Sequence, residues 1–285
     1  MRLCRFKTAK LPARIGLVVD ESAIADLEPA GVTSLEQVLE HSDPTAFLRS
    51  IQTNGFTPIP LAKVTLLAPV EQQEVWAAGV TYLRSRTARM EESDFSASAY
   101  DRVYDAERPE LFFKSMPHKV IGPGGAVGIR RDARWSVPEP ELALVLNSKA
   151  KIVGFTIGND MSSRDIEGAN LLYLPQAKIY DGSCALGPWI ELAANETDAR
   201  QWQINLKIKR EARCVFEGQT SVSQIKRSFQ ELASYLFRSQ TLPFGAVLLT
   251  GTGVIPPDSF TLQAGDDLEI VISGIGVLKN SVRVV

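Results

Sequence analysis

Two glutamates at the start of an apolar segment are the residues best suited to chemistry in this sequence. Glu139 and Glu141 stand two positions apart, directly ahead of the apolar run 142–146. Side chains two apart in a strand share a face, so the two carboxylates would repel each other unless a cation lies between them. The alternative is a charged strand entry that faces solvent. Pro138 and Pro140 cannot donate ladder hydrogen bonds, which confines the segment to a sheet edge or to a mouth.

A third carboxylate follows at the end of the next apolar segment. Residues 152–158 predict a strand, and Asp160 comes just after it. Three hard oxygen ligands without a nearby histidine or thiolate favour Mg²⁺, with Mn²⁺ or Ca²⁺ as alternatives, over zinc. The competing interpretation is that Asp160 or Ser162 only caps a short helix over 164–168.

A lysine and a cysteine further along have two interpretations each. Lys178 lies between apolar residues and is either a surface side chain or a group that holds an enolate or moves a proton beside a metal. Cys184 could be a nucleophile, but it has no basic neighbour to lower its pKa, which favours a small buried filler. His41 and His118 are the only histidines, which excludes an HExxH zinc site.

Composition excludes several classes of protein. The chain has 285 residues, 45 % of them hydrophobic and 22 % charged, which is typical of an ordinary globular protein. Its net charge of −2 provides no basic excess for nucleic acid, and no apolar run approaches the ~18 residues of a membrane span. Three scattered cysteines argue against a zinc ribbon or a disulfide framework. We expect a cytoplasmic protein.

The pattern along the chain predicts an α+β fold that is mainly β, with two units. Residues 1–68 look like a small N-terminal α/β domain, and residues 69–285 like a β-rich catalytic domain. Apolar residues at helical spacing predict one good helix over 224–238. The segment 82–108 is too polar for a core, so it is either a solvated surface helix or a lid over a ligand.

Four blocks of residues together resemble the fumarylacetoacetate hydrolase family. The resemblance covers about residues 70–285 and keeps the family's order and spacing. The blocks are Glu139-x-Glu141-Leu-Ala, residues 154–165 (GFTIGNDMSSRD), Lys178 followed by Leu186-Gly-Pro-Trp-Ile190, and Thr250-Gly-Thr252-Gly with residues 265–282.

The resemblance implies a fold, an assembly and a set of site residues. The implied fold is the family's mixed β-sandwich roll, and the implied assembly is a homodimer or a higher homo-oligomer. Glu139, Glu141 and Asp160 match the divalent-metal ligands of the family. Lys178 matches its active-site lysine, and Thr252 matches the threonine that meets the substrate carboxylate.

One departure from the family pattern concerns the reaction. Members that hydrolyse carbon–carbon bonds carry a histidine in a motif that here reads Gly79-Val-Thr-Tyr-Leu-Arg-Ser85, with Ser85 at the histidine position. The chain is instead similar to the branch that dehydrates 2-keto-3-deoxy sugar acids, in which Glu110 matches a site glutamate. We expect the substrate to be contacted also by residues around that motif, namely Thr81, Tyr82, Ser85 and Arg86.

The resulting expectation is a lyase that removes water from a 2-keto-3-deoxy sugar acid, such as 2-keto-3-deoxy-arabinonate, through a metal-bound enolate. Glu110 and Lys178 are the candidates for moving the C3 proton and stabilising the enolate. Which of the two does which stays open. The alternatives are a carbon–carbon hydrolase of acylpyruvate or fumarylacetoacetate-type substrates, and a decarboxylase or isomerase of 2-keto acids.

Overall fold

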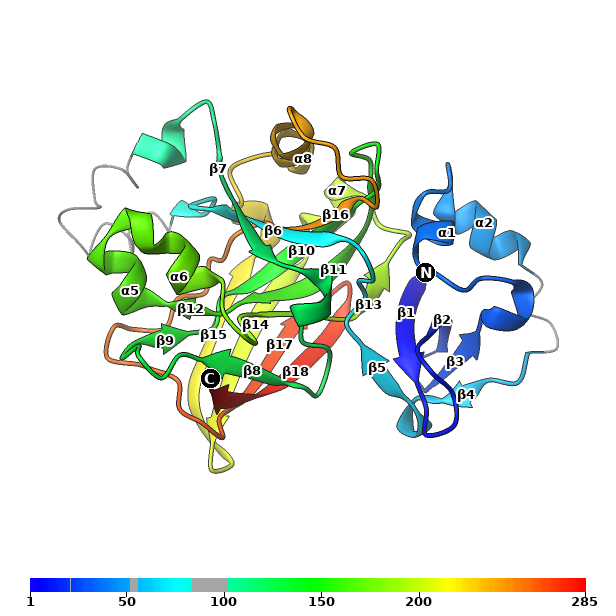
Figure 1. Cartoon of the computed structure of the whole chain (residues 1–285), viewed down its shortest axis with the longest axis horizontal. Helices are drawn as coiled ribbons and strands as arrows, with labels where there is room; N and C mark the ends of the chain where they lie inside the picture. The colour runs from blue at the N-terminus through cyan, green and yellow to red at the C-terminus, as the bar shows by residue number, and fades with distance from the viewer. Residues whose placement is uncertain (21, 52–55, 84–101) are drawn as a thin grey trace.

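The computed structural model describes residues 1–285 except 21, 52–55 and 84–101, and two sheets dominate it (Figure 1). The larger sheet runs in the order β4-β3-β2-β1-β13-β11-β10-β16-β6-β7, with β5 paired to β1, and the smaller in the order β15-β14-β17-β18-β8. A two-stranded ribbon, β9-β12, lies beside them. This mainly β arrangement confirms the predicted fold class.

The strands of the larger sheet are β1 Arg2–Lys7, β2 Arg14–Asp20, β3 Ala23–Asp26, β4 Ile59–Pro60, β5 Thr65–Leu67, β6 Glu74–Gly79, β7 Glu110–Ser115, β10 Pro140–Leu146, β11 Ile152–Asp160, β13 Cys184–Glu191 and β16 Ala246–Leu249. Those of the smaller sheet are β8 Ala126–Ile129, β14 Gln203–Arg210, β15 Arg213–Ser221, β17 Asp267–Ile272 and β18 Gly276–Val284, and the ribbon consists of β9 Ser136–Val137 and β12 Ser162–Ser163. The α-helices are α1 Glu36–Leu39, α2 Pro44–Ser50, α5 Arg164–Ala169, α6 Leu174–Lys178, α7 Glu196–Ala199 and α8 Phe229–Phe237. The 3₁₀ helices are η1 Glu28–Ala30, η2 Leu61–Lys63, η3 Pro117–Lys119, η4 Leu171–Tyr173 and η5 Val222–Gln224. No helix in the described part of the chain combines the length and the apolar content needed to cross a membrane.

Strand β10 is buried on both faces, which is why its sequence is a continuous apolar run rather than an alternating one. Leu142 and Leu144 pack in the main core between the two sheets, together with Leu206 of β14. Ala143 and Val145 point to the other face and pack in a second core cluster. Glu139 directly precedes this strand and Glu141 is its second residue, so the packing on both faces of the strand fixes the backbone that carries them.

The N-terminal residues form a lobe at one end of the molecule (Figure 1). Strand β1 pairs antiparallel with β13, so the lobe's strands continue the larger sheet. Leu3 and Ile15 from this lobe share a core cluster with Val145 and Val247 of the central strands. The division into domains at residues 68 and 69 stays a prediction.

Two details of the sequence prediction are wrong. Strand β10 is central, between β11 and β16, so the predicted sheet edge is wrong, whereas the predicted mouth agrees with the cavity that Glu139 and Glu141 line. Pro140 is tolerated in a central strand because it is the first residue of β10. The helix predicted from residue 224 begins at Phe229, because Ser228 caps it by accepting a hydrogen bond from the Glu231 amide at 3.1 Å. Ile225 lies outside the helix but is buried all the same.

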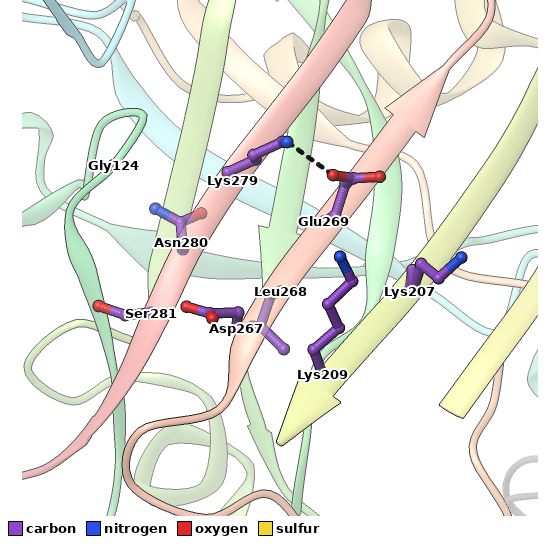
Figure 2. A pocket seen from close by; sticks show the side chains of 9 residues that line it. All are labelled: Gly124, Lys207, Lys209, Asp267, Leu268, Glu269, Lys279, Asn280 and Ser281. Carbon is purple, nitrogen blue, oxygen red and sulfur yellow. Dashed lines mark ion pairs between the residues drawn. The ribbon is translucent and has the colours of Figure 1, made fainter. Parts of the chain in front are cut away.

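The outer face of the smaller sheet has a hollow of about 350 Å³ lined by charged side chains (Figure 2). Lys207, Glu269 and Lys279 lie in one row across β14, β17 and β18, and the Lys279 ammonium lies 2.8 Å from Glu269. Neighbouring residues in these strands, such as Leu268 and Leu278, point into the core instead. Such cross-strand pairing of opposite charges is ordinary for a solvated sheet face. None of the residues that line this hollow also lines the cavity that contains the three predicted carboxylates.

Candidate metal centre and active site

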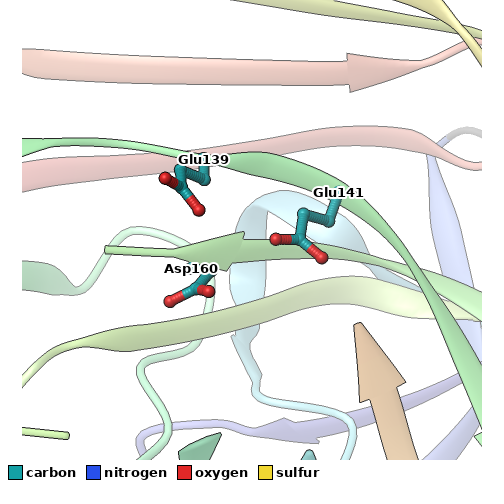
Figure 3. Close-up of side chains that lie close together, drawn as sticks. All are labelled: Glu139, Glu141 and Asp160. Carbon is teal, nitrogen blue, oxygen red and sulfur yellow. The ribbon is translucent and has the colours of Figure 1, made fainter. Parts of the chain in front are cut away.

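Three buried carboxylates lie at one end of the hairpin formed by β10 and β11 (Figure 3). One ligand oxygen from each of Glu139, Glu141 and Asp160 lies within 4.8 Å of the others. The hairpin register pairs Glu141 with Gly158, and the Asp160 amide donates to the Glu139 carbonyl at 2.9 Å. Oxygens bound to one cation at 2.0–2.5 Å are at most about 4–5 Å apart. The three carboxylates thus have the spacing of a ligand set.

Cationic side chains neutralise part of this negative charge, and two of them, Lys178 and Arg164, bind Glu139. Lys178, the last residue of α6, donates to Glu139 Oε2 at 2.7 Å, to Asp160 Oδ2 at 3.2 Å and to Ser162 Oγ at 2.6 Å. Arg164, the first residue of α5, donates to Glu139 Oε1 at 3.2 Å. Both are 2 % exposed. The alternative that Lys178 is a surface side chain is therefore wrong.

The helix-cap interpretation of Asp160 and Ser162 is also wrong. Helix α5 starts at Arg164 with Ser163 at the N-cap position. Ser162 instead donates to the Asp160 carbonyl at 3.0 Å and accepts from Lys178. Cys184 is 1 % exposed, and burial raises its pKa to about 12, which confirms the buried-filler interpretation.

Glu141 differs from its neighbours because no cationic group of the described residues forms an ion pair with it. Within the described part of the chain, no Lys or Arg nitrogen lies within 4 Å of its carboxylate, which accepts one hydrogen bond from the Gly251 amide at 2.5 Å. A buried carboxylate with like charges beside it is costly without a counter-ion. The cavity beside it has a volume of about 20 Å³, which is room for about one water-sized group. These residues fit a hard divalent cation.

Further predicted residues line the same cavity as the carboxylates. Its lining includes Glu110 from β7 and Thr252, besides Lys178 and the three carboxylates. Gly79 pairs with Glu110 across β6 and β7, and a Cβ atom at Gly79 would lie 2.0 Å from Glu110 Oε2. The glycine therefore leaves space for the glutamate side chain. Val80, the next residue, also lines the cavity and has a φ of 51°, an unusual angle for a β-branched residue.

Two predicted substrate contacts lie behind the cavity rather than in its lining. Thr81 donates from Oγ1 to the Thr250 carbonyl at 2.6 Å, and a Cβ atom at Gly251 would lie 2.2 Å from this hydroxyl. Tyr82 is fully buried, and its ring packs against Gly253. Both residues thus support the loop whose amide binds Glu141. Ser85 and Arg86, with residues 84–101 of the expected lid, lie outside the described residues.

Sequence reasoning missed several polar residues of the site. Glu167, on α5, lines the cavity and is 4 % exposed. Lys114, on β7, is fully buried and forms an ion pair with Asp160. The sequence offers one signal for Lys114, which is a charged residue directly after the apolar run 111–113 of a predicted strand. The roles of all these residues stay predictions.

Metal binding should depend on pH through Glu141. Its burial, and then the charges of Asp160 and Glu139, raise its pKa well above the ordinary value of 4.5. A carboxyl with a raised folded pKa stabilises the fold below its unfolded pKa, and this contribution is lost as the pH rises through the folded pKa. A bound cation replaces the missing proton. We expect Mg²⁺ to raise Tm more at pH 7.5 than at pH 5.5, as measured by calorimetry. Equal increases at the two pH values would contradict this.

The Gly251 amide should matter for metal affinity. Gly251 has a φ of +91°, so replacing it with alanine adds backbone strain as well as the contact with Thr81 Oγ1. We expect Gly251→Ala to weaken Mn²⁺ binding at least tenfold, because the amide that donates to Glu141 moves. Gly265→Ala is the matched control: its φ is +88° and no atom lies within 4 Å of the added Cβ. Equal Mn²⁺ affinities in the two variants would exclude this role.

Comparison with known proteins identifies a family and relatives that cover most of the chain. Residues 74–283 match the model of the fumarylacetoacetate (FAA) hydrolase C-terminal family. A probable 2-keto-3-deoxyxylonate dehydratase of Haloferax volcanii is 48 % identical over 76 % of this chain and 74 % of its own length. A 2-dehydro-3-deoxy-D-arabinonate dehydratase of Saccharolobus solfataricus is 37 % identical over 93 % of this chain and 91 % of its own.

A solved structure extends the similarity to the fold. It is a 2-keto-3-deoxy-D-arabinonate dehydratase complexed with magnesium and 2,5-dioxopentanoate, 34 % identical to this chain. The match has a TM-score of 0.82 and covers 100 % of this chain and 99 % of that one. The family match agrees with the extent of the resemblance found in the sequence motifs. The chain belongs to the fumarylacetoacetate hydrolase family.

Proposed function

We propose that this protein is a Mg²⁺-dependent dehydratase of a 2-keto-3-deoxy sugar acid, such as 2-keto-3-deoxy-arabinonate. One observation carries the proposal: a fully buried lysine contacts two of three clustered carboxylates in a cavity that contains no histidine. A dehydratase needs groups that hold a cation and move a proton. The curated dehydratases of sugar acids described above support the same reaction.

The metal would be held by Glu139, Glu141 and Asp160, whose oxygens have the necessary spacing. When bound, a divalent cation polarises the 2-keto group and makes the C3 proton acidic. The hard oxygen donors favour Mg²⁺, and Mn²⁺ or Ca²⁺ also suit such ligands. The relative complexed with magnesium supports Mg²⁺ here.

Glu110 and Lys178 would move the protons of the reaction. Both line the cavity with the three carboxylates. One of them removes a proton from C3, and the electron pair left on C3 expels the C4 hydroxyl, which leaves as water after taking up a proton. Transfer of a second proton from C5 to C3 and ketonisation then give the aldehyde, so that the substrate has lost one water overall. A preorganised ammonium next to the developing enolate oxygen lowers the barrier.

Thr252 would hold the carboxylate of the substrate. It lines the cavity, is 3 % exposed, and its hydroxyl lies 3.3 Å from the Val254 carbonyl. Ser85 and Arg86 are proposed as further substrate contacts from the family resemblance alone.

Carbon–carbon hydrolysis is disfavoured by the positions of the histidines. His41 stacks on Phe47 in the N-terminal lobe, and His118 belongs to η3, so neither lines the cavity. No other histidine exists in the sequence. The histidine that activates water in the hydrolases is therefore missing here, since Ser85 stands at its position in the sequence.

A substrate panel tests the proposal. The purified chain with Mg²⁺ is assayed against 2-keto-3-deoxy sugar acids and acylpyruvates, and each reaction is repeated with excess EDTA. We expect a metal-dependent semialdehyde from at least one sugar acid. Turnover of acylpyruvates alone would replace the dehydratase with a hydrolase.

Two further properties are proposed on the sequence and the family resemblance. We expect a homodimer or a higher homo-oligomer, which light scattering after size-exclusion chromatography can test. We also expect a cytoplasmic location, because the cysteines are few and scattered.

A further inference from the structure

Three residues of β7 reach the site. Glu110, Phe112 and Lys114 alternate along this strand, which forms the edge of the larger sheet next to β6. Glu110 and Phe112 line the cavity, and the Lys178 ammonium lies 5.8 Å from the centre of the Phe112 ring. Lys114, the third residue, lies behind the lining.

Lys114 is completely buried, and its ammonium group contacts two chain segments of the site. It donates to the Met161 carbonyl at 3.0 Å, just after β11, and to the Lys178 carbonyl at 2.5 Å, at the end of α6. It also forms an ion pair with Asp160 Oδ1. The two atoms are close, but their geometry is not that of a hydrogen bond. Burying an ammonium group costs several kcal/mol unless such partners satisfy it. A space-filling role would be met better by an apolar side chain.

Each of the two carboxylate oxygens of Asp160 therefore contacts a different lysine. Lys114 forms an ion pair with Oδ1, whereas the Lys178 ammonium lies 3.2 Å from Oδ2. Lys114 also fixes the backbone of Lys178 itself. A single buried group thus sets both the orientation of a proposed metal ligand and the position of the proposed catalytic lysine.

We propose that Lys114 is a positioning residue that aligns Asp160 with Lys178. The inference deepens the proposed function and rests on it for the roles of those two residues. Lys114 does not touch the substrate space; it acts through its neighbours. Effects on substrate affinity and turnover should therefore exceed effects on metal affinity. Asp160 keeps its contact with Lys178 when Lys114 changes, and Glu139 and Glu141 are held by Arg164 and by the Gly251 amide.

The test compares Lys114→Met and Lys114→Arg with Lys119→Met. Arginine keeps the positive charge and the donors but moves them, so Lys114→Arg is the second variant in case Lys114→Met does not fold. Lys119 is the matched control, because it is half-exposed and pairs only with Asp181 among the described residues. Mn²⁺ affinity is measured by electron paramagnetic resonance. The affinity of the Mn²⁺-loaded protein for 2-oxobutyrate, a keto acid without a leaving hydroxyl, is measured in the same way, and kcat is measured with the best sugar acid.

We expect Lys114→Arg to bind Mn²⁺ within threefold of the parent, to bind 2-oxobutyrate at least fivefold more weakly and to lose at least tenfold in kcat. Folded Lys114→Met should lose at least a hundredfold in kcat. Parent-like 2-oxobutyrate affinity and kcat in Lys114→Arg would overturn the proposal. If the parent dehydrates no sugar acid, the proposed function fails, while the 2-oxobutyrate affinities still decide the role of Lys114.

Discussion

Lys178→Met should lower kcat at least a thousandfold while the fold and metal binding persist. The lysine is 2 % exposed and contacts Glu139, Asp160 and Ser162, so its ammonium has a fixed position beside the proposed ligands. Methionine has a similar length but can neither donate a proton nor stabilise an enolate. A thousandfold loss corresponds to about 4 kcal/mol of transition-state stabilisation.

The controls for Lys178→Met separate catalysis from folding. The variant leaves two buried carboxylates with less counter-charge, so Mn²⁺ should bind it at least as tightly as it binds the parent. Lys279→Met is the matched surface control, because Lys279 is 67 % exposed and pairs with Glu269 on the outer sheet face. Turnover of Lys178→Met within tenfold of the parent would show that the lysine has no catalytic role.

Glu141→Gln should have opposite effects on metal affinity and on the stability of the metal-free protein. The variant removes one of the three proposed ligands, so we expect Mn²⁺ affinity to fall at least a hundredfold, or about 2.7 kcal/mol. It also removes a buried charge that has like charges beside it, and whose pKa is raised for that reason. In EDTA, its Tm should therefore equal or exceed that of the parent.

The measurements for Glu141→Gln are Mn²⁺ titration and calorimetry with and without metal. The glutamine keeps the size of the glutamate and an oxygen that can accept from the Gly251 amide, so loss of packing does not explain a lower affinity. Retained Mn²⁺ affinity, or a large loss of Tm in EDTA, would remove Glu141 from the ligand set.

The fold of the central strands could be predicted because its signals are local. Residues 142–146 are an uninterrupted apolar run, and residues 152–158 are apolar apart from Thr156. With the short connection between them, this is the pattern of two buried neighbouring strands. The position of β10 within the sheet could not be predicted from Pro138 and Pro140, because a proline is tolerated both at an edge and at the first residue of a central strand. The start of α8 was missed because Ile225 belongs to the apolar pattern but packs from outside the helix.

In the candidate site, too, local patterns could be predicted, whereas contacts between distant segments could not. Glu139 and Glu141 could be paired from strand alternation, and Asp160 from its position at the end of the next strand. The arrangement of Lys114 could not be predicted, because it depends on where edge strand β7 lies relative to the end of α6, about sixty residues later in the chain. Arg164 lay inside a recognised motif, but its bond to Glu139 depends on how α5 packs.

The most direct measurement of the central claim is the carbon skeleton of the product. Uniformly ¹³C-labelled 2-keto-3-deoxy-arabinonate is incubated with the purified chain and Mg²⁺, and the products are followed by ¹³C NMR. We expect one five-carbon product, 2,5-dioxopentanoate, with all carbon–carbon couplings retained, and at least a thousandfold slower formation of it with Lys178→Met. Fragments of two and three carbons, or no reaction with this and the other 2-keto-3-deoxy sugar acids, would contradict it.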